Sequence, residues 1–285
     1  MNLTRSAKIW GIALVIFGIG NMSAECKAAL GKGASRMINR NIVDMEKNED
    51  AMAAYSLFQR VWEDLCSKFG EKNLKFPRQI IFLNGAPGAG KGTNTITVMR
   101  VFEISSKPVE VSSLLTTPEC EELKEKGMLV GDDIVIAQIM REILRPANAR
   151  GIIIDGFPRT TIQAYFLKIL IDRLAEDTGE EKPVFKMVNF SVSQQTSVSR
   201  QLFRGTTTIQ QNQKASKLGQ KQTALRATDM SEEAASLRYQ LYKKSISECI
   251  EILRDSLDFF EIDSEGTFEE VRNRTQDTLS GEKSL

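Results

Sequence analysis

The segment at residues 85–94, GAPGAGKGTN, combines glycines with a lysine and a threonine, which are residue types that bind phosphate groups. An apolar run that predicts a buried strand precedes it at Gln79–Leu83, and a helix-compatible run follows at Thr93–Val101. Three glycines let the backbone approach an anion and offer it N–H groups: Gly85, Gly88 and Gly90. Lys91 adds a mobile charge for the β- and γ-phosphates. We therefore predict a phosphate-binding loop at the start of a helix; a plain glycine-rich turn is the alternative.

A second cluster of polar residues follows the apolar, β-branched run Ile152–Ile154, which predicts a fully buried strand. Asp155 ends this strand, and in a parallel sheet that end lies beside the phosphate-binding loop. A carboxylate there can orient water on Mg²⁺, whereas a turn-forming aspartate is the simpler alternative. The next residues, Gly156–Thr160, include Arg159, whose planar guanidinium suits a phosphate. The two clusters together predict a site for phosphate groups and Mg²⁺.

The details of both motifs resemble one family of phosphoryl-transfer enzymes. A strict P-loop has Ser or Thr directly after the lysine, whereas here Gly92 intervenes before Thr93. The pattern GxPGxGKGT, and DGFPRT followed by Gln163, resemble the adenylate kinase family of nucleoside monophosphate (NMP) kinases. The resemblance extends through roughly residues 78–275, so we place an adenylate-kinase-like domain at 78–280, and it implies Mg²⁺ bound with ATP. The ATP-binding residues that it implies are Gly85, Gly88, Ala89, Gly90, Lys91, Gly92, Thr93, Arg204 and Gly266.

The resemblance also implies where AMP binds. In the family, the arginine of DGFPRT holds the monophosphate and the glutamine reads the adenine, and these positions are Arg159 and Gln163 here. Ser113 resembles the threonine at the start of the family's NMP-binding helix, and residues 127–130 resemble its GKLV segment. The implied AMP-binding residues are Ser113, Met128, Leu129, Val130, Gly156, Phe157, Pro158, Arg159, Gln163, Arg226 and Arg238.

One departure from the family concerns the acceptor side. The family usually has GD-x-x-R shortly after the threonine that Ser113 resembles, but here Leu114–Thr117 follows. No arginine lies between Val101 and Met140, so the monophosphate loses one guanidinium partner. This loss leaves the identity of the acceptor nucleotide open.

The segment from residue 191 to residue 228 contains no Asp or Glu and several basic residues: Arg200, Arg204, Lys214, Lys217, Lys221 and Arg226. Arginines here could neutralise charge on the transferring phosphoryl group, whereas we expect the three lysines to belong to a solvated loop. Arg200 and Arg204 resemble the segment that opens the family's lid. The residues Arg226, Asp229, Glu233, Arg238 and Tyr242 resemble the pattern that closes it. The implied catalytic set is Lys91, Arg159, Arg200, Arg204, Arg226 and Arg238, with a loop between residues 206 and 225 that could be mobile.

The composition excludes several classes of chemistry. The chain has 285 residues, of which 41% are hydrophobic, and a net charge of +1, so nothing indicates a nucleic-acid partner. It lacks histidine, which excludes Ser-His-Asp and Cys-His mechanisms and histidine-bound metals. Its four cysteines are scattered: Cys26, Cys66, Cys120 and Cys249. They cannot build the four-cysteine zinc lid of some adenylate kinases, so we expect no zinc. We expect the cysteines to be structural thiols. A disulfide is the alternative if the chain is exported.

The elements alternate between strands and helices. Strand-like runs occur at 79–83, 109–111, 151–154, 184–191 and 259–262, and helical runs at about 93–103, 117–144, 161–176, 194–204, 229–256 and 267–279. This order predicts an α/β P-loop NTPase fold in which a five-stranded parallel sheet carries helices on both faces. We place an NMP-binding insert at about residues 112–145 and a short lid at about 205–226.

The N-terminal region predicts targeting. Arg5 and Lys8 precede an apolar run at residues 9–20, so residues 1–24 have the layout of a signal peptide or a membrane anchor. A buried N-terminal helix is the alternative. Residues 25–77 then form a linker, polar over residues 25–50, and an amphipathic helix at 51–69, expected to pack on the core and otherwise to dock a partner. We expect a protein that is exported or contacts a membrane through residues 9–20; a cytoplasmic protein is the alternative.

The sequence thus predicts a monomeric kinase that transfers the γ-phosphoryl group of ATP·Mg²⁺ to AMP and forms two ADP. Two alternatives stay open. One is a kinase for another nucleoside monophosphate, such as UMP or CMP, and the other is a nucleotide-binding regulatory protein with weak turnover.

Overall fold

The fold is centred on a parallel sheet of five strands, seen in a computed structural model that describes residues 48–125, 130–175 and 182–281. The strands are β1 (Gln79–Gly85), β2 (Val109–Glu110), β3 (Ile152–Asp155), β4 (Val184–Ser191) and β5 (Asp258–Asp263), in the order β2-β3-β1-β4-β5. All four pairings are parallel, and Phe82 of β1 pairs with Ile154 of β3 and Met187 of β4. The predicted fold class and all five predicted strands are confirmed.

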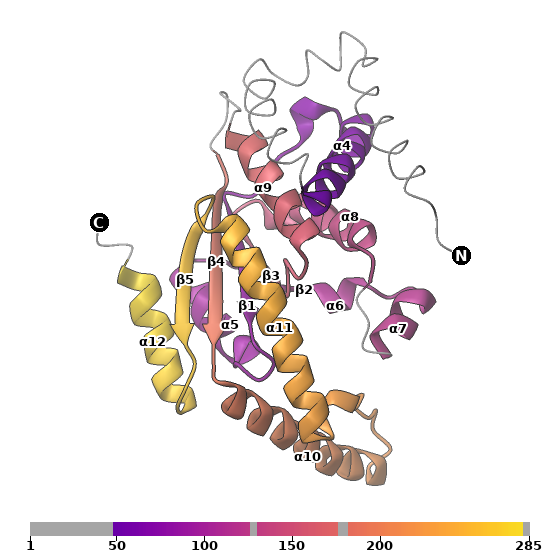
Figure 1. Cartoon of the computed structure of the whole chain (residues 1–285), viewed down its shortest axis with the longest axis vertical. Coiled ribbons are helices and arrows are strands. Elements are labelled where there is room, and N and C mark those ends of the chain that lie inside the picture. Colours follow the sequence, from indigo (N-terminus) through magenta and orange to yellow (C-terminus); the bar gives the residue numbers. More distant parts are fainter. Residues whose placement is uncertain (1–47, 126–129, 176–181, 282–285) are drawn as a thin grey trace.

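Both faces of the sheet are covered because its central strands are apolar on both sides. Phe82 and Ile154 join one core with residues of α4 (Glu49–Phe69), α8 (Asp132–Ile143), α9 (Thr161–Ala175) and α11 (Glu232–Leu253). Ile81 and Ile153 point the other way, into a core with α5 (Lys91–Val101) and α12 (Phe268–Ser280). Figure 1 shows these two layers of helices around the strands.

Two of the predicted helical runs have different bounds in the structure. The run at 117–144 contains α7 (Pro118–Glu125) and α8, which begins after Gly131, while residues 126–129 lie outside the described part. The helix predicted at 229–256 begins only at Glu232, because Ala227–Asp229 form a 3₁₀ turn and the Ser231 side chain caps α11. The short elements not yet named are α6 (Val111–Leu114), η1 (Glu71–Asn73) and η2 (Pro146–Asn148).

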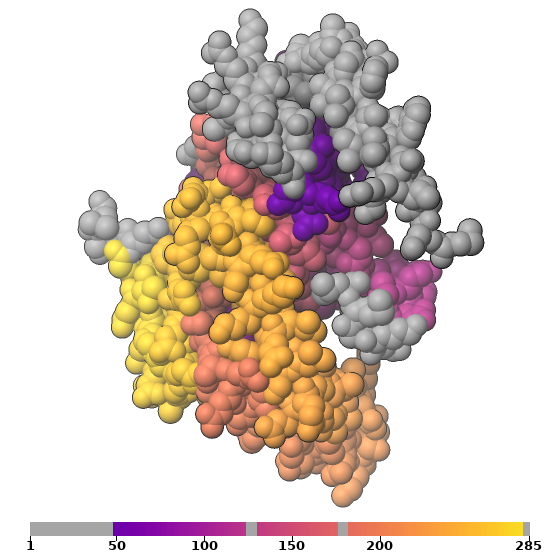
Figure 2. Space-filling model, viewed as in Figure 1, coloured from indigo at the N-terminus to yellow at the C-terminus, as the bar shows by residue number. Residues whose placement is uncertain are grey.

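The prediction of a loop between residues 206 and 225 was wrong for its first half. Helix α10 (Gln194–Lys217) runs well past residue 204 and continues through Gly205, and it ends shortly before Gly219, whose φ is +65°. The side-chain amide of Asn212 then bonds both the N–H and the C=O of Thr223, at 2.8 and 2.7 Å. The returning chain is thereby tied to α10, which lies at the lower end of the molecule in Figures 1 and 2.

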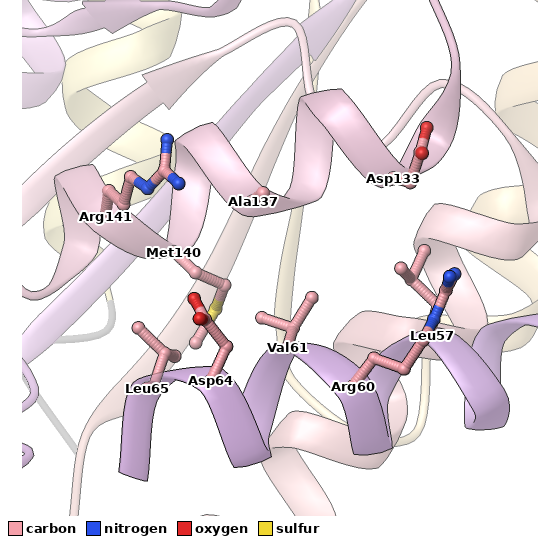
Figure 3. A pocket seen from close by; sticks show the side chains of 9 residues that line it. All are labelled: Leu57, Arg60, Val61, Asp64, Leu65, Asp133, Ala137, Met140 and Arg141. Atoms are coloured by element: carbon pink, nitrogen blue, oxygen red, sulfur yellow. The ribbon is translucent and has the colours of Figure 1, made fainter. Parts of the chain in front are cut away.

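The amphipathic helix expected at 51–69 is α4, and it packs on the core as predicted. It starts at Glu49, because the Asn48 side chain accepts hydrogen bonds from two N–H groups of the first turn, so residues 48–50 do not belong to a linker. Phe58 stacks on Trp62 and contacts Phe166 of α9. A cavity of about 170 Å³ remains between α4 and α8, with Asp64 and Arg141 among the charged side chains at its edge (Figure 3).

The predicted targeting segment, residues 1–24, and most of the predicted linker lie outside the described residues. No helix in the described part of the chain is long and apolar enough to cross a membrane.

Candidate functional site

The phosphate-binding loop follows β1 at the carboxyl edge of the sheet and leads directly into α5. Gly88 and Gly90 have φ angles of +77° and +81°, which favour glycine. A Cβ atom on Gly88 would lie 3.1 Å from the carbonyl oxygen of Ser197, so the loop also touches α10 closely. The Ser197 hydroxyl donates to the carbonyl of Pro87 at 2.7 Å. Ala89 is buried below the loop, whereas Gly92 and Thr93 are exposed at the start of α5.

Lys91 is the first residue of α5, and its side chain turns back over the loop. The ammonium group donates to the carbonyl of Gly85 at 2.6 Å and to that of Ala86 at 3.4 Å. Desolvation by burial lowers the pKa of Lys91 to about 8, and the nearby carboxylate of Asp155 opposes this shift. The lysine is therefore held at the loop by carbonyl oxygens that a phosphate could replace as partners.

Asp155 ends β3 next to the phosphate-binding loop. Burial raises the pKa of its carboxyl group, and the positive charges of Lys91 and Arg159 oppose that shift. Mg²⁺ that arrives with ATP needs only one or two carboxylates besides phosphate oxygens and water. Asp155 supplies a carboxylate and Thr93 supplies a hydroxyl oxygen, so the residues fit such an ion. Within the described residues, no group of three Asp, Glu, Cys or His side chains could hold a metal alone.

Arg159 lies on the turn between β3 and α9. Its side chain keeps much of its surface open to solvent, but desolvation of the guanidinium by burial lowers its pKa, with Asp155 opposing the shift. The loop before it contains a cis peptide bond at Phe157-Pro158, and the buried Asn84 amide donates to the carbonyl of Phe157 at 3.3 Å. These contacts fix the turn that carries Arg159 against the end of β1.

A second group of arginines meets at Asp229. The guanidinium of Arg204 donates to both carboxylate oxygens of Asp229, each at 2.7 Å. Arg238 donates to the hydroxyl of Thr228 at 3.1 Å and approaches Asp229 at 3.5 Å. Burial lowers the pKa of Arg238 to about 10, and the charges of Arg226 and Arg204 add to the shift. Arg204, Arg226 and Arg238 therefore lie close enough for their charges to interact. The side chain of Arg226 is exposed.

The sequence reasoning included Asp229 in a pattern but did not assign it a site role. Its side chain is only 4% exposed, and it is the acidic partner of both Arg204 and Arg238. A signal was present in the sequence, because Asp229 is the first acidic residue after a stretch that contains six basic ones.

Arg200 lies one helical turn before Arg204 on α10, but its partners are backbone carbonyls. It donates to the carbonyls of Gly88, Ser264 and Gly266 at 3.3, 3.0 and 2.9 Å. The side chain thereby joins the phosphate-binding loop to the segment between β5 and α12. Gly266, predicted on the ATP side, lies in that segment with a φ of +96°.

The remaining residues that the sequence predicts for the acceptor side lie in different environments. Ser113 is exposed on α6, and its hydroxyl donates to the carbonyl of Glu110 at 2.7 Å. Val130 is buried in the core beside α8, and Met128 and Leu129 lie outside the described residues.

Gln163, on the first turn of α9, is 3% exposed and both ends of its amide are occupied. Its oxygen accepts from the N–H of Arg159 at 2.8 Å, and its nitrogen donates to Asp132 at 2.8 Å. Sequence reasoning missed Asp132, which has no special residue type or spacing to mark it.

Five residues are brought together at the carboxyl edge of the sheet: Lys91, Asp155, Arg159, Arg204 and Arg238. The charges of the last four all act on the pKa of Lys91. The five residues come from four separate places in the chain: the loop after β1, the end of β3 and its following turn, α10 and α11. A cluster of cations of this kind can bind and neutralise the phosphates of a nucleotide.

Comparisons with known proteins find relatives of this chain. The family model described as adenylate kinase matches residues 83–257. The adenylate kinase of Archaeoglobus fulgidus is 27% identical over 215 residues, which are 67% of this chain and 95% of that protein. Adenylate kinase 4 of Oryza sativa subsp. japonica is 32% identical over 41% of this chain and 48% of its own length. The adenylate kinase of Parabacteroides distasonis is 30% identical over 44% of this chain and 66% of its own.

Among solved structures, a gluconokinase from Sinorhizobium meliloti 1021 aligns with 74% of this chain and 95% of its own. The TM-score is 0.41 and the identity is 13%.

Proposed function

Since the chain belongs to the adenylate kinase family of phosphotransferases, we propose that it transfers the γ-phosphoryl group of ATP to AMP and forms two ADP. The observation that carries the proposal is the convergence of Lys91, Asp155 and Arg159 with the arginines held by Asp229 at one edge of the sheet. This arrangement suits direct in-line transfer, for which positioning and charge stabilisation suffice.

Each group then has a role on the proposed reaction path. Lys91 exchanges its carbonyl partners for the β- and γ-phosphates and follows the phosphoryl group. Arg159 and Arg238 hold the acceptor phosphate, while Arg204 and Arg226 neutralise charge on the donor. Arg200 acts from its contacts with the phosphate-binding loop. No general base is required, because the acceptor phosphate is already an anionic nucleophile.

Mg²⁺ bound with ATP would neutralise phosphate charge, and Asp155 would hold it through a water molecule. We propose no zinc for this protein. Cys66, Cys120 and Cys249 are free thiols in the structure, and burial raises the pKa of Cys249 to about 12, which disfavours the thiolate that zinc requires.

A coupled assay of ADP formation on the full chain tests the proposal. AMP, CMP, UMP and GMP are compared as acceptors, and a reaction without acceptor measures simple ATP hydrolysis. We expect ADP from AMP at least about tenfold faster than from UMP. Turnover with UMP or CMP alone would identify another NMP kinase. No turnover, together with tight ATP binding, would support a regulatory protein, which the missing acceptor-side arginine favours.

We further propose that the protein is a monomer and that residues 1–24 target it for export or anchor it in a membrane, contacting the bilayer through residues 9–20. Arg5, Lys8 and the apolar run support the second proposal. N-terminal sequencing of the mature protein, with cell fractionation, tests it. An intact Met1 on a cytoplasmic protein would overturn the targeting proposal and leave the kinase proposal unchanged. Sedimentation equilibrium tests the monomer.

A further inference from the structure

The first turn of α4 is hydrogen-bonded to the start of α9, the helix that follows the turn carrying Arg159. The carboxylate of Asp50 accepts from the hydroxyl of Thr161, which is the first residue of α9. One turn further along α9, the hydroxyl of Tyr165 accepts from the side-chain amide of Asn48 at 2.9 Å. Helix α4 therefore contacts α9 close to the residue proposed to hold the acceptor phosphate.

The end of α4 that makes these bonds is itself well fixed. The side-chain oxygen of Asn48 accepts from the N–H groups of Asp50 and Ala51 at 3.0 and 3.1 Å, so one amide caps α4 and also binds α9. Two turns further along α4, Phe58 contacts Phe166 of α9, with ring centroids 5.4 Å apart. This packing holds the carboxylate of Asp50 in a defined place beside the start of α9.

The position of Arg159 depends in turn on the start of α9. The backbone N–H of Arg159 donates to the side-chain oxygen of Gln163 at 2.8 Å, and the N–H of Gln163 donates to the hydroxyl of Thr160 at 3.1 Å. Helix α11 also contacts this turn, since Ser245 donates to the carbonyl of Arg159 and the thiol of Cys249 to that of Thr160. The turn and the start of α9 thus form one hydrogen-bonded unit, which α11 and α4 hold in place.

We propose that Asp50 is a positioning residue for the acceptor phosphate, because its bond to Thr161 holds the start of α9 where the guanidinium of Arg159 can meet that phosphate. The inference rests on the proposed function. It gives α4, which precedes the residues 83–257 matched by the family model, a part in acceptor binding. A carboxylate at the N-terminal end of a helix also interacts favourably with the helix dipole. A displacement of about 1 Å in a substrate-binding group can cost about a hundredfold in rate.

Three substitutions test the bond between α4 and α9. Thr161→Val removes the donor and keeps the shape of the side chain, and Asp50→Ala removes the acceptor. Asp50→Asn keeps an oxygen that can accept from Thr161. Tyr165→Phe is the matched structural control, because it removes the other bond between these two helices, one turn farther from Arg159. Circular dichroism checks the fold of each full-length variant, and urea unfolding compares their stabilities.

The decisive readout is the KM for AMP compared with the KM for ATP, measured in the coupled assay, with AMP binding measured by calorimetry. We expect Thr161→Val and Asp50→Ala to raise the KM for AMP about fivefold to tenfold, since a hydrogen bond to a charged group is lost. The KM for ATP should stay near the wild-type value. Asp50→Asn should recover most of the AMP affinity. Tyr165→Phe should lower the urea midpoint as Thr161→Val does and leave the KM for AMP unchanged.

The double variant Arg159→Ala/Thr161→Val tests whether the bond acts through Arg159. If it does, Thr161→Val weakens AMP binding in the wild-type background and adds no further loss once Arg159 is alanine. Losses that add fully in the double variant would overturn the inference.

The outcomes distinguish this inference from the proposed function. If AMP is turned over and Thr161→Val keeps the wild-type KM for AMP, or raises it no more than Tyr165→Phe does, the inference fails and the kinase proposal stands. If the wild type binds AMP without turnover and only the substitutions at Asp50 and Thr161 weaken that binding, the kinase proposal fails and the inference stands. A wild type that does not bind AMP overturns both.

Discussion

Replacement of Asp229 by asparagine should both destabilise the protein and slow phosphoryl transfer. The Asp229 side chain is 4% exposed and accepts two hydrogen bonds of 2.7 Å from Arg204, with Arg238 at 3.5 Å. A hydrogen bond to a charged group contributes about 1.5–3 kcal/mol, so the two short bonds together give about 3–6 kcal/mol. The side chains of Arg204 and Arg238 are 37% and 32% exposed, so water can solvate them once the carboxylate is lost. We therefore expect half of this energy, about 1.5–3 kcal/mol, to appear as lost stability.

The losses of stability and of activity in Asp229→Asn should be visible in two separate measurements. Urea unfolding followed by circular dichroism gives the free energy of unfolding, and the coupled assay gives kcat. Because two guanidinium groups lose the anchor that places them, we expect kcat to fall on the order of a hundredfold. The control is Asp64→Asn on α4, which removes an exposed pair with Lys68 at 2.7 Å. It should cost no more than about 0.5 kcal/mol. If Asp229→Asn changes stability by no more than this control and keeps kcat within about threefold of wild type, the anchoring role is refuted.

Four further predictions concern the nucleotide sites. Lys91→Ala should reduce kcat about 10²–10³-fold, while circular dichroism shows an intact fold. The control Lys217→Ala, at the exposed end of α10, should leave kcat unchanged. Comparable rates for the two variants would contradict the phosphate-loop assignment. The pKa of Lys91 is about 8, so kcat/KM for ATP should fall as the pH rises through this value and the lysine loses its proton, and Lys91→Arg should abolish that fall; an identical pH profile in both proteins would assign the ionisation elsewhere. Arg159→Ala should raise the KM for AMP about tenfold or more, since a charge-assisted contact is lost, while the KM for ATP stays near the wild-type value; equal effects on both would argue against an acceptor-side role. Diadenosine pentaphosphate, which spans donor and acceptor sites, should bind at least about a hundredfold more tightly than ATP in calorimetry, and equal affinities would indicate a single nucleotide site.

The sheet could be predicted from the sequence because its strands are short, apolar and separated by clear helical runs. β4 was predicted at its observed bounds, and β1 and β3 within two residues, since Ile80–Leu83 and Ile152–Ile154 are buried on both faces. The extent of α10 could not be predicted, because its second half is polar and gives no apolar periodicity. Two hydrogen bonds between Asn212 and Thr223 tie that half to the returning chain, and no local sequence pattern reveals them.

The site was predicted where backbone conformation requires particular residues. Gly88 and Gly90 adopt positive φ, and Lys91 starts a helix, so the phosphate-binding loop leaves a recognisable pattern. The residues that hold the functional side chains in place leave no recognisable pattern in the sequence. Asp229 and Asp132 are ordinary acidic residues in the chain, and their importance comes from contacts that only the folded structure creates.

Helix α10 connects the phosphate-binding loop with the buried carboxylate of Asp229. Arg200 and Arg204 are four residues apart and therefore lie on one face of the helix. The first is bound to the carbonyl of Gly88 in the phosphate-binding loop, and the second to the buried carboxylate of Asp229. A displacement of α10 would have to break three carbonyl contacts of Arg200 or both bonds of Arg204. The two arginines of α10 that are proposed to serve the donor are therefore tied to the phosphate-binding loop and to Asp229.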